Sequence, residues 1–117
     1  MKKIYYLSTC DTCKRIIKEL ELTEDFVLQD IKAEPITKKQ LEEMRALTDS
    51  YESLFSKRAR LYKELGLKDK NLEDKDYKNY ILEHYTFLKR PVVIVNNQIF
   101  IGNAKKQVEG ARAALHG

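Results

Sequence analysis

The chain has few cysteines and histidines, the residues from which structural zinc sites are usually built. Its 117 residues include two cysteines, Cys10 and Cys13, and two histidines, His84 and His116, which are not spaced as a pair. A structural zinc site needs four ligands and typically takes two such cysteine pairs. We therefore expect no metal site and no bound cofactor. A carrier of a soft metal stays open as an alternative, because Cu(I) accepts two thiolates.

Long hydrophobic runs are also absent. No stretch approaches the ~20 apolar residues of a membrane helix, and the apolar run near the N-terminus is too short for a signal peptide. We therefore expect a cytoplasmic protein that makes no membrane contact. Because the cytoplasm keeps thiols reduced, a static disulfide is a poor explanation for the two cysteines.

Charge of one sign does not dominate the sequence. The 22 Lys and Arg residues and the 18 Asp and Glu residues give a net charge of +4 and are interleaved along the chain. Without a basic arm or stripe, we expect no direct binding of nucleic acid. The chain also has no repeat, low-complexity segment or linker, and its length suits one domain with its own core.

The first third of the sequence predicts a strand, a helix and a second strand. Residues 3–7 and 26–30 are short apolar runs of the kind found in buried strands. Between them, residues 11–22 repeat apolar side chains every three or four positions, which is the pattern of a helix with one buried face. This order predicts a βαβ unit with a parallel strand pair.

The middle of the chain is predicted to be helical over about residues 37–85. Thr37 and Gln40 have the spacing of a capping box at the start of a helix. Gly66 is expected to end a later helix, and Asp74 is expected to cap another.

The last part of the chain predicts two strands and a helix. The apolar run 90–95 and residues 98–101 are joined by Asn96-Asn97, which predicts a two-residue hairpin turn. Apolar residues at helical spacing then predict a closing helix. The whole order, βαβ, helices, ββα, predicts an α/β fold with a thioredoxin-like mixed four-stranded sheet and an all-helical insertion between its halves.

Cys10 and Cys13 form a C-x-x-C motif at the predicted junction between the first strand and the first helix. Unpaired N–H groups and the helix dipole favour an anion there, and Lys14 and Arg15 add positive charge, so the Cys10 pKa should fall. Asp11 opposes this effect. Cys13 lies on the predicted core face and should keep a higher pKa, which suits a resolving thiol. An inert pair, with Cys13 buried and Cys10 idle, stays open as an alternative.

Three stretches carry a resemblance to a known family: "YYLSTCDTCKR" near the start, "KRARLYKELGL" in the middle and "LKRPVVIVNNQIFIGN" near the end. Together they resemble the ArsC/Spx family, which contains glutaredoxin-linked arsenate reductases and the Spx transcriptional regulators. The resemblance covers essentially the whole chain. It implies a single thioredoxin-fold domain over residues 1–117.

The resemblance also implies roles for individual residues. Cys10 matches the redox-active cysteine, and Cys13 matches the second cysteine of Spx-type members. Arg90 matches an arginine that binds the oxyanion in the reductases, and Pro91 matches a cis-proline that lies against the active cysteine. Arg58 aligns with a basic position of Spx-like members.

Other residues near the motifs are also candidates, and two positions depart from the family pattern. Thr12 and Lys14, in the first turn after Cys10, are additional candidates for binding an anionic substrate. The reductases surround the oxyanion with three arginines. Here Ser56 and the stretch ending at Asn103 stand where the other two are expected.

These observations predict a thiol-disulfide oxidoreductase of the arsenate-reductase type. Its electron donor would be glutathione or another small thiol, or a glutaredoxin or thioredoxin, and we expect a monomer. The alternative is an Spx-like redox-sensing regulator in which the same C-x-x-C pair controls binding to RNA polymerase.

Overall fold

The computed structural model describes residues 1–117, which form two compact units. The first unit combines residues 1–35 with residues 90–117, and the second comprises residues 36–89. The predicted helical insertion falls within the second unit. That the whole chain acts as one domain stays a prediction.

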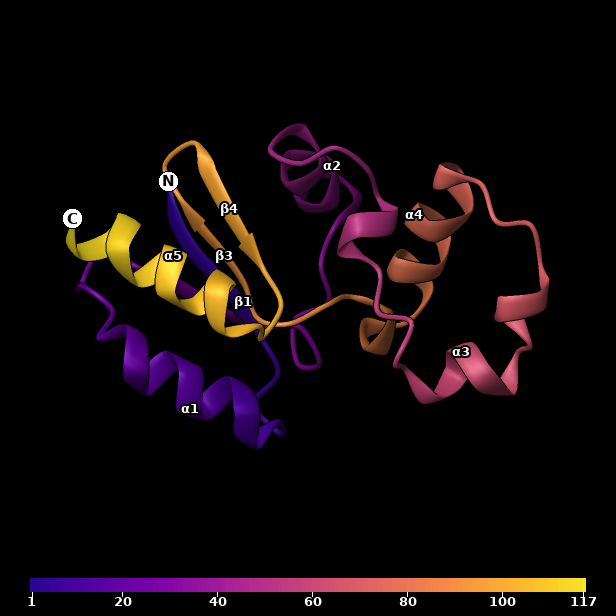
Figure 1. Cartoon of the computed structure of the whole chain (residues 1–117), viewed down its shortest axis with the longest axis horizontal. Helices are drawn as coiled ribbons and strands as arrows, with labels where there is room; N and C mark the ends of the chain where they lie inside the picture. The colour runs from indigo at the N-terminus through magenta and orange to yellow at the C-terminus, as the bar shows by residue number, and fades with distance from the viewer. The chain divides into compact units, whose positions relative to one another are not determined.

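A mixed four-stranded sheet is the centre of the first unit (Figure 1). β1 runs parallel to β2, whereas β3 is antiparallel to both β1 and β4. The strand order across the sheet is β2-β1-β3-β4, which confirms the predicted α/β, thioredoxin-like arrangement. The strands are β1 (Lys2–Tyr6), β2 (Val27–Asp30), β3 (Val92–Val95) and β4 (Gln98–Ile101).

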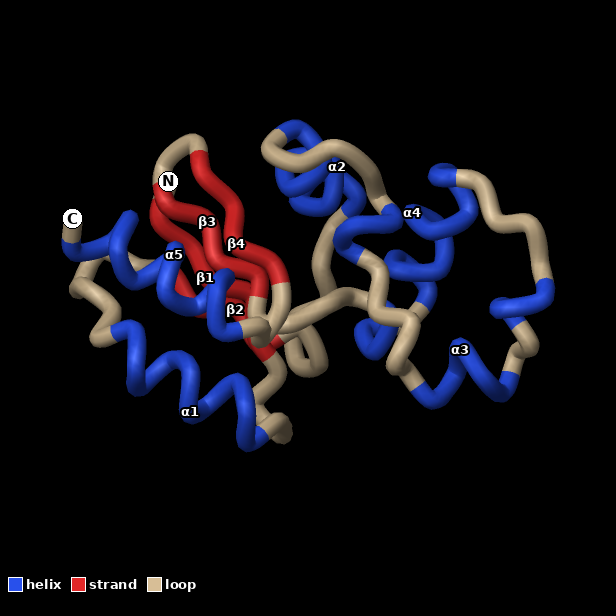
Figure 2. The backbone as a smooth tube through the Cα atoms, in the orientation of Figure 1, coloured by secondary structure: helices blue, strands red, loops and turns tan.

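Two helices lie side by side against the sheet of the first unit, as Figure 2 shows: α1 (Asp11–Leu20) and α5 (Lys105–His116). Their apolar stripes and the sheet residues beneath them form one buried cluster, which includes Ile4, Ile16, Leu20, Val93 and Ala111. Full burial of a side chain such as Ile16 or Leu20 contributes roughly 1.5–3 kcal/mol. This core therefore fixes α1 on the sheet and, with it, the cysteines that α1 carries.

The turn and helix ends of the first unit follow from local sequence. Val95 pairs with Gln98, so Asn96 and Asn97 form the predicted two-residue turn, and Asn96 takes a left-handed φ of 56° that asparagine tolerates. The last helix continues to His116, whose Nε2 lies 2.8 Å from the carbonyl oxygen of Leu20 at the end of α1. The closing helix is thus attached to α1 at its end.

The second unit contains three α-helices: α2 (Lys38–Ala46), α3 (Arg60–Glu64) and α4 (Asp74–Glu83). Short 3₁₀ turns lie between them at Glu52–Leu54 and Leu67–Asp69, and a third, Tyr85–Phe87, follows α4. The capping box of α2 is present as predicted, with Gln40 N–H donating to Thr37 Oγ1 at 3.1 Å and Thr37 N–H donating to Gln40 Oε1 at 3.0 Å. The buried Phe55 ring packs against three other aromatic rings, those of Tyr62, Tyr77 and Phe87.

The cap of α4 differs from the prediction by one residue. Glu73, not Asp74, is the N-cap, and it forms a reciprocal capping box with Asp76. Asp74 instead accepts hydrogen bonds from the N–H groups of Tyr51 and Glu52, both at 3.1 Å. Adjacent acidic residues can each serve as a cap, and here the nearby 3₁₀ turn uses the second one.

None of the helices has the length and apolar character needed to cross a membrane.

Candidate functional site

The C-x-x-C motif begins in a tight turn between β1 and α1. The Cys10 N–H donates to the Leu7 carbonyl oxygen at 3.0 Å, and this bond closes the turn. The Lys14 N–H donates to the Cys10 carbonyl oxygen at 3.2 Å, and this is the first hydrogen bond of the helix. Cys10 is therefore the N-cap residue of α1, with an extended backbone. The three-residue spacing places Cys13 one turn further along, on the face of α1 that is directed into the core.

The two thiols occupy different environments. Both are free, Cys10 is half-buried, and Cys13 has no exposed surface. The Cys13 thiol donates a hydrogen bond to the Cys10 sulfur, so the two sulfur atoms are in contact. Proximity of the two sulfur atoms is one condition that a pair must meet to form a disulfide.

The surroundings of Cys10 favour its thiolate. Burial acts to raise the pKa of the Cys10 thiol, but the backbone N–H and the thiol of Cys13, the backbone N–H of Thr12 and the charge of Arg90 outweigh it. The net effect holds the Cys10 pKa below its ordinary value. The donors from Thr12 and Cys13 are unpaired N–H groups of the first helical turn, as the sequence predicted.

The surroundings of Cys13 favour its protonated form. Burial raises the pKa of the Cys13 thiol most, and its hydrogen bond to Cys10 acts in the same direction, while the Leu7 backbone and Arg90 oppose them; the net effect brings the pKa to about 11. At neutral pH the pair therefore contains one ionisable, partly accessible sulfur and one protonated, enclosed sulfur. Such a pair can divide nucleophilic attack and resolution between its members.

Arg90 and Pro91 join this site from the other end of the sequence. Arg90 is half-buried and close enough for its positive charge to lower the pKa of both thiols. The Arg90–Pro91 peptide bond is cis, as the resemblance implied, and the Pro91 carbonyl oxygen accepts a 2.9 Å hydrogen bond from the Gly102 N–H. β3 starts directly afterwards and runs beside β1, so the sheet brings Arg90 to the turn of Cys10.

The remaining candidates from the sequence have varied positions. The Thr12 N–H acts directly on the Cys10 sulfur. Lys14 and Arg15 are exposed on α1, and Arg15 pairs with Glu19 at 3.8 Å. Arg58 belongs to the second unit, where it is exposed in the turn before α3. The substrate-binding roles of Thr12, Lys14 and Arg58 stay predictions.

The sequence predictions did not include two residues beside the site, Ser8 and Asp30. Asp30 ends β2 and accepts hydrogen bonds from the hydroxyl and the N–H of Ser8, two residues before Cys10. The Ser8 hydroxyl is the main cause that lowers the pKa of Asp30. The predicted parallel strand pair could have revealed this contact. The carboxyl ends of parallel strands meet at one edge of a sheet, which pairs Asp30 with the end of β1.

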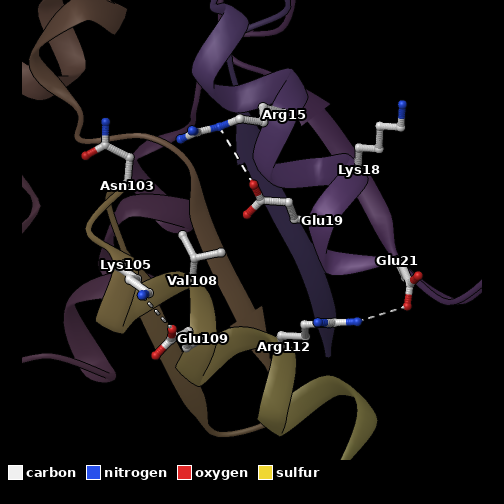
Figure 3. Close-up of a pocket in the computed structure, with 9 residues that line it drawn as sticks. All are labelled: Arg15, Lys18, Glu19, Glu21, Asn103, Lys105, Val108, Glu109 and Arg112. Atoms are coloured by element: carbon white, nitrogen blue, oxygen red, sulfur yellow. Dashed lines mark hydrogen bonds and ion pairs between the residues drawn. The ribbon is translucent and has the colours of Figure 1, made fainter.

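A separate groove of about 660 Å³ lies between α1 and α5 (Figure 3). Charged side chains dominate its lining, but they pair with one another: Lys105 with Glu109 at 3.9 Å and Arg112 with Glu21 at 3.4 Å. Neither cysteine lines it. No group of three or more His, Cys, Asp and Glu side chains is arranged to hold a metal ion.

Comparisons with known proteins identify a family and individual relatives that the chain resembles. The family model of the ArsC family matches residues 5–111. The global transcriptional regulator Spx of Bacillus subtilis is 24% identical over 110 residues, which cover 92% of this chain and 84% of that protein.

Solved structures show the same fold. An arsenate reductase from Vibrio cholerae superposes with a TM-score of 0.74 at 24% identity, covering 94% of this chain and 96% of that one. A protein described as a possible arsenate reductase from Streptococcus mutans gives a TM-score of 0.71 at 27% identity, covering 93% and 98%. Because the family model spans nearly all of the sheet, both cysteines and Arg90, the chain belongs to the ArsC family.

Proposed function

We propose that this protein is a cytoplasmic thiol-disulfide oxidoreductase resembling the arsenate reductases, with Cys10 as the attacking thiol and Cys13 as the resolving thiol. The observation that carries the proposal is the contact between two free thiols whose pKa values are displaced in opposite directions. A thiolate is the nucleophile in thiol-disulfide exchange, and its protonated neighbour is kept for the second step.

The reaction balances with a disulfide substrate. The Cys10 thiolate attacks one sulfur, the substrate S–S bond breaks, and the departing thiolate takes up a proton. Cys13 then loses its proton and attacks the Cys10 sulfur, which forms a Cys10–Cys13 disulfide and releases the second substrate thiol. The substrate gains two electrons and the cysteine pair loses two. Two molecules of glutathione or another small thiol, or one glutaredoxin or thioredoxin dithiol, return the electrons and become oxidised.

Other residues would shape and charge this site. The guanidinium of Arg90 would hold an anion, either an oxyanion or a carboxylate of glutathione, because its fork of donors matches such groups. Thr12 and Lys14 would assist at the start of α1, and Arg58 would be a further anion-binding residue. Pro91 would shape the site next to Cys10. No metal or tightly bound cofactor takes part in this scheme.

Single cysteine variants test the proposed roles. Turnover of a small disulfide, and separately of arsenate, is followed with glutathione as donor. Cys10→Ser should abolish turnover, because the attacking sulfur is gone. In Cys13→Ser, Cys10 should still attack the substrate, but the mixed disulfide on Cys10 should accumulate because no resolving thiol is present, and mass spectrometry detects this species. Unchanged turnover in Cys10→Ser would exclude Cys10 as the nucleophile.

A second candidate function is supported by the curated relative. Because the similarity to the Spx regulator covers 92% of this chain, the same cysteine pair could switch binding to RNA polymerase instead of turning over a substrate. Two assays, co-purification with RNA polymerase and turnover with a thiol donor, distinguish the regulator from the enzyme. Redox-dependent co-purification with the polymerase, without turnover with any thiol donor, would favour the regulator. Turnover that is lost in Cys10→Ser would favour the enzyme.

A further inference from the structure

One carboxylate ties the turn that carries Cys10 to the neighbouring strand. Asp30 is the last residue of β2 and the register partner of Tyr6, the last residue of β1. Its Oδ2 accepts a 2.5 Å hydrogen bond from Ser8 Oγ, and its Oδ1 accepts a longer bond of 3.4 Å from the Ser8 N–H. The Lys32 N–H donates to the same carboxylate at 3.2 Å, which orients it from its own side.

Ser8 has a particular place in this turn. The turn runs from Leu7 to Cys10, so Ser8 is its second residue and Cys10 its last. The hydrogen-bond donors that favour the Cys10 thiolate, the N–H groups of Thr12 and Cys13 and the Cys13 thiol, all belong to α1. Their alignment with the Cys10 sulfur therefore depends on where the turn places Cys10 relative to the first helical turn. An anchor on Ser8 restricts that placement.

We infer that Asp30 is a positioning residue for Cys10. Through its hydrogen bonds to Ser8, Asp30 holds the turn that places the Cys10 thiol at the start of α1. The inference rests on the proposed role of Cys10 as the attacking thiol. Asp30 suits this task because its carboxylate is ionised at neutral pH, where it accepts from both donors of Ser8 at once.

A direct electrostatic role for Asp30 would have the opposite sign. A carboxylate beside a thiolate raises the pKa of the thiol, so removing its charge would lower the Cys10 pKa. Loss of the anchor instead misaligns the donors that stabilise the thiolate, and the Cys10 pKa rises. The direction of the shift thus distinguishes the two effects.

The test measures the alkylation rate of Cys10 by iodoacetamide against pH, with the modified peptide identified by mass spectrometry. In Asp30→Ala and Ser8→Ala the midpoint should move upward by about half a pH unit, which slows alkylation roughly threefold at a pH below the midpoint. The double variant should shift no further than the larger single one, because both changes remove the same interaction.

Asp25→Ala is the matched control. Asp25 precedes β2 at the opposite end of the strand, and its carboxylate also accepts from a hydroxyl, that of Thr23, and pairs with Lys2 at 3.0 Å. Its removal should leave the midpoint of Cys10 unchanged.

Three results would overturn the inference: an unchanged midpoint in both test variants, a downward shift, or an equal shift in Asp25→Ala. If Asp30→Ala does not fold, Ser8→Ala, which keeps the carboxylate, decides the question. A wild-type midpoint at the ordinary value of a thiol is a separate outcome, because it would contradict the proposed role of Cys10 itself.

Discussion

Two cysteines three positions apart have opposite acid–base character in this protein. Cys10 has a lowered pKa in the folded state, so its ionised form stabilises the fold above the ordinary thiol pKa, and this stabilisation is lost as the pH falls through the lowered value. Cys13 has a raised pKa, so its neutral form stabilises the fold below the ordinary value, and this stabilisation is lost as the pH rises toward about 11. The window between the two values is where the pair is asymmetric.

Arg90 contributes more of the positive charge that acts on the Cys10 thiol than Lys14 does, although Lys14 is closer to Cys10 in sequence. Arg90→Met should raise the alkylation midpoint of Cys10, because a half-buried guanidinium near the sulfur is lost. Lys14→Met should produce a smaller shift, because the exposed Lys14 ammonium is screened by solvent. The measurement is the alkylation rate against pH at low ionic strength. A larger shift in Lys14→Met would contradict the assignment to Arg90.

At the scale of elements, the contact between α5 and β4 depends on a glycine. A Cβ built on Gly110 would lie 2.9 Å from Cε1 of the Phe100 ring, closer than packed atoms normally approach. Gly110 therefore lets the helix lie directly against this ring.

Gly110→Ala should destabilise the protein although alanine is the better helix former by about 1 kcal/mol. The close approach to Phe100 should cost more than the gain in helix propensity. Urea denaturation measures the outcome as a lower midpoint. In a Phe100→Val background, which removes the ring, the same substitution should become stabilising. A higher midpoint for Gly110→Ala with Phe100 intact would show that the ring moves aside without cost.

The elements themselves were largely predictable from the sequence. The strands, the hairpin turn at Asn96 and the cap at Thr37 depend on residues close together in sequence, so periodicity and turn chemistry reveal them. The cap of α4 was misassigned because Glu73 and Asp74 are equally suitable locally, and the use of Asp74 by a turn more than 20 residues away decided between them. The contact of His116 with Leu20 likewise needs the helix packing to be known.

At the scale of the whole molecule, the site is assembled from distant parts of the sequence. The C-x-x-C motif alone predicted a thiol with a lowered pKa at a helix start and a second thiol one turn further along, because the helix start is a local feature. The effect of Arg90 on Cys10 and the anchor from Asp30 depend on the order and register of the sheet, which brings β2 and β3 to either side of β1. Periodicity does not specify that register, although the parallel pairing that it suggested was a usable clue for Asp30.

The complete enclosure of Cys13 has a consequence for counting thiols. A bulky maleimide should label the native, reduced protein once, at Cys10, because Cys13 has no exposed surface. The second label should appear only after unfolding, as intact mass would show in the presence and absence of denaturant. Rapid double labelling of the native protein would contradict this expectation. A count of labelled thiols in the native protein would therefore give one cysteine per chain. The second thiol, which can supply the second electron of a disulfide exchange, is enclosed beyond the reach of a bulky reagent.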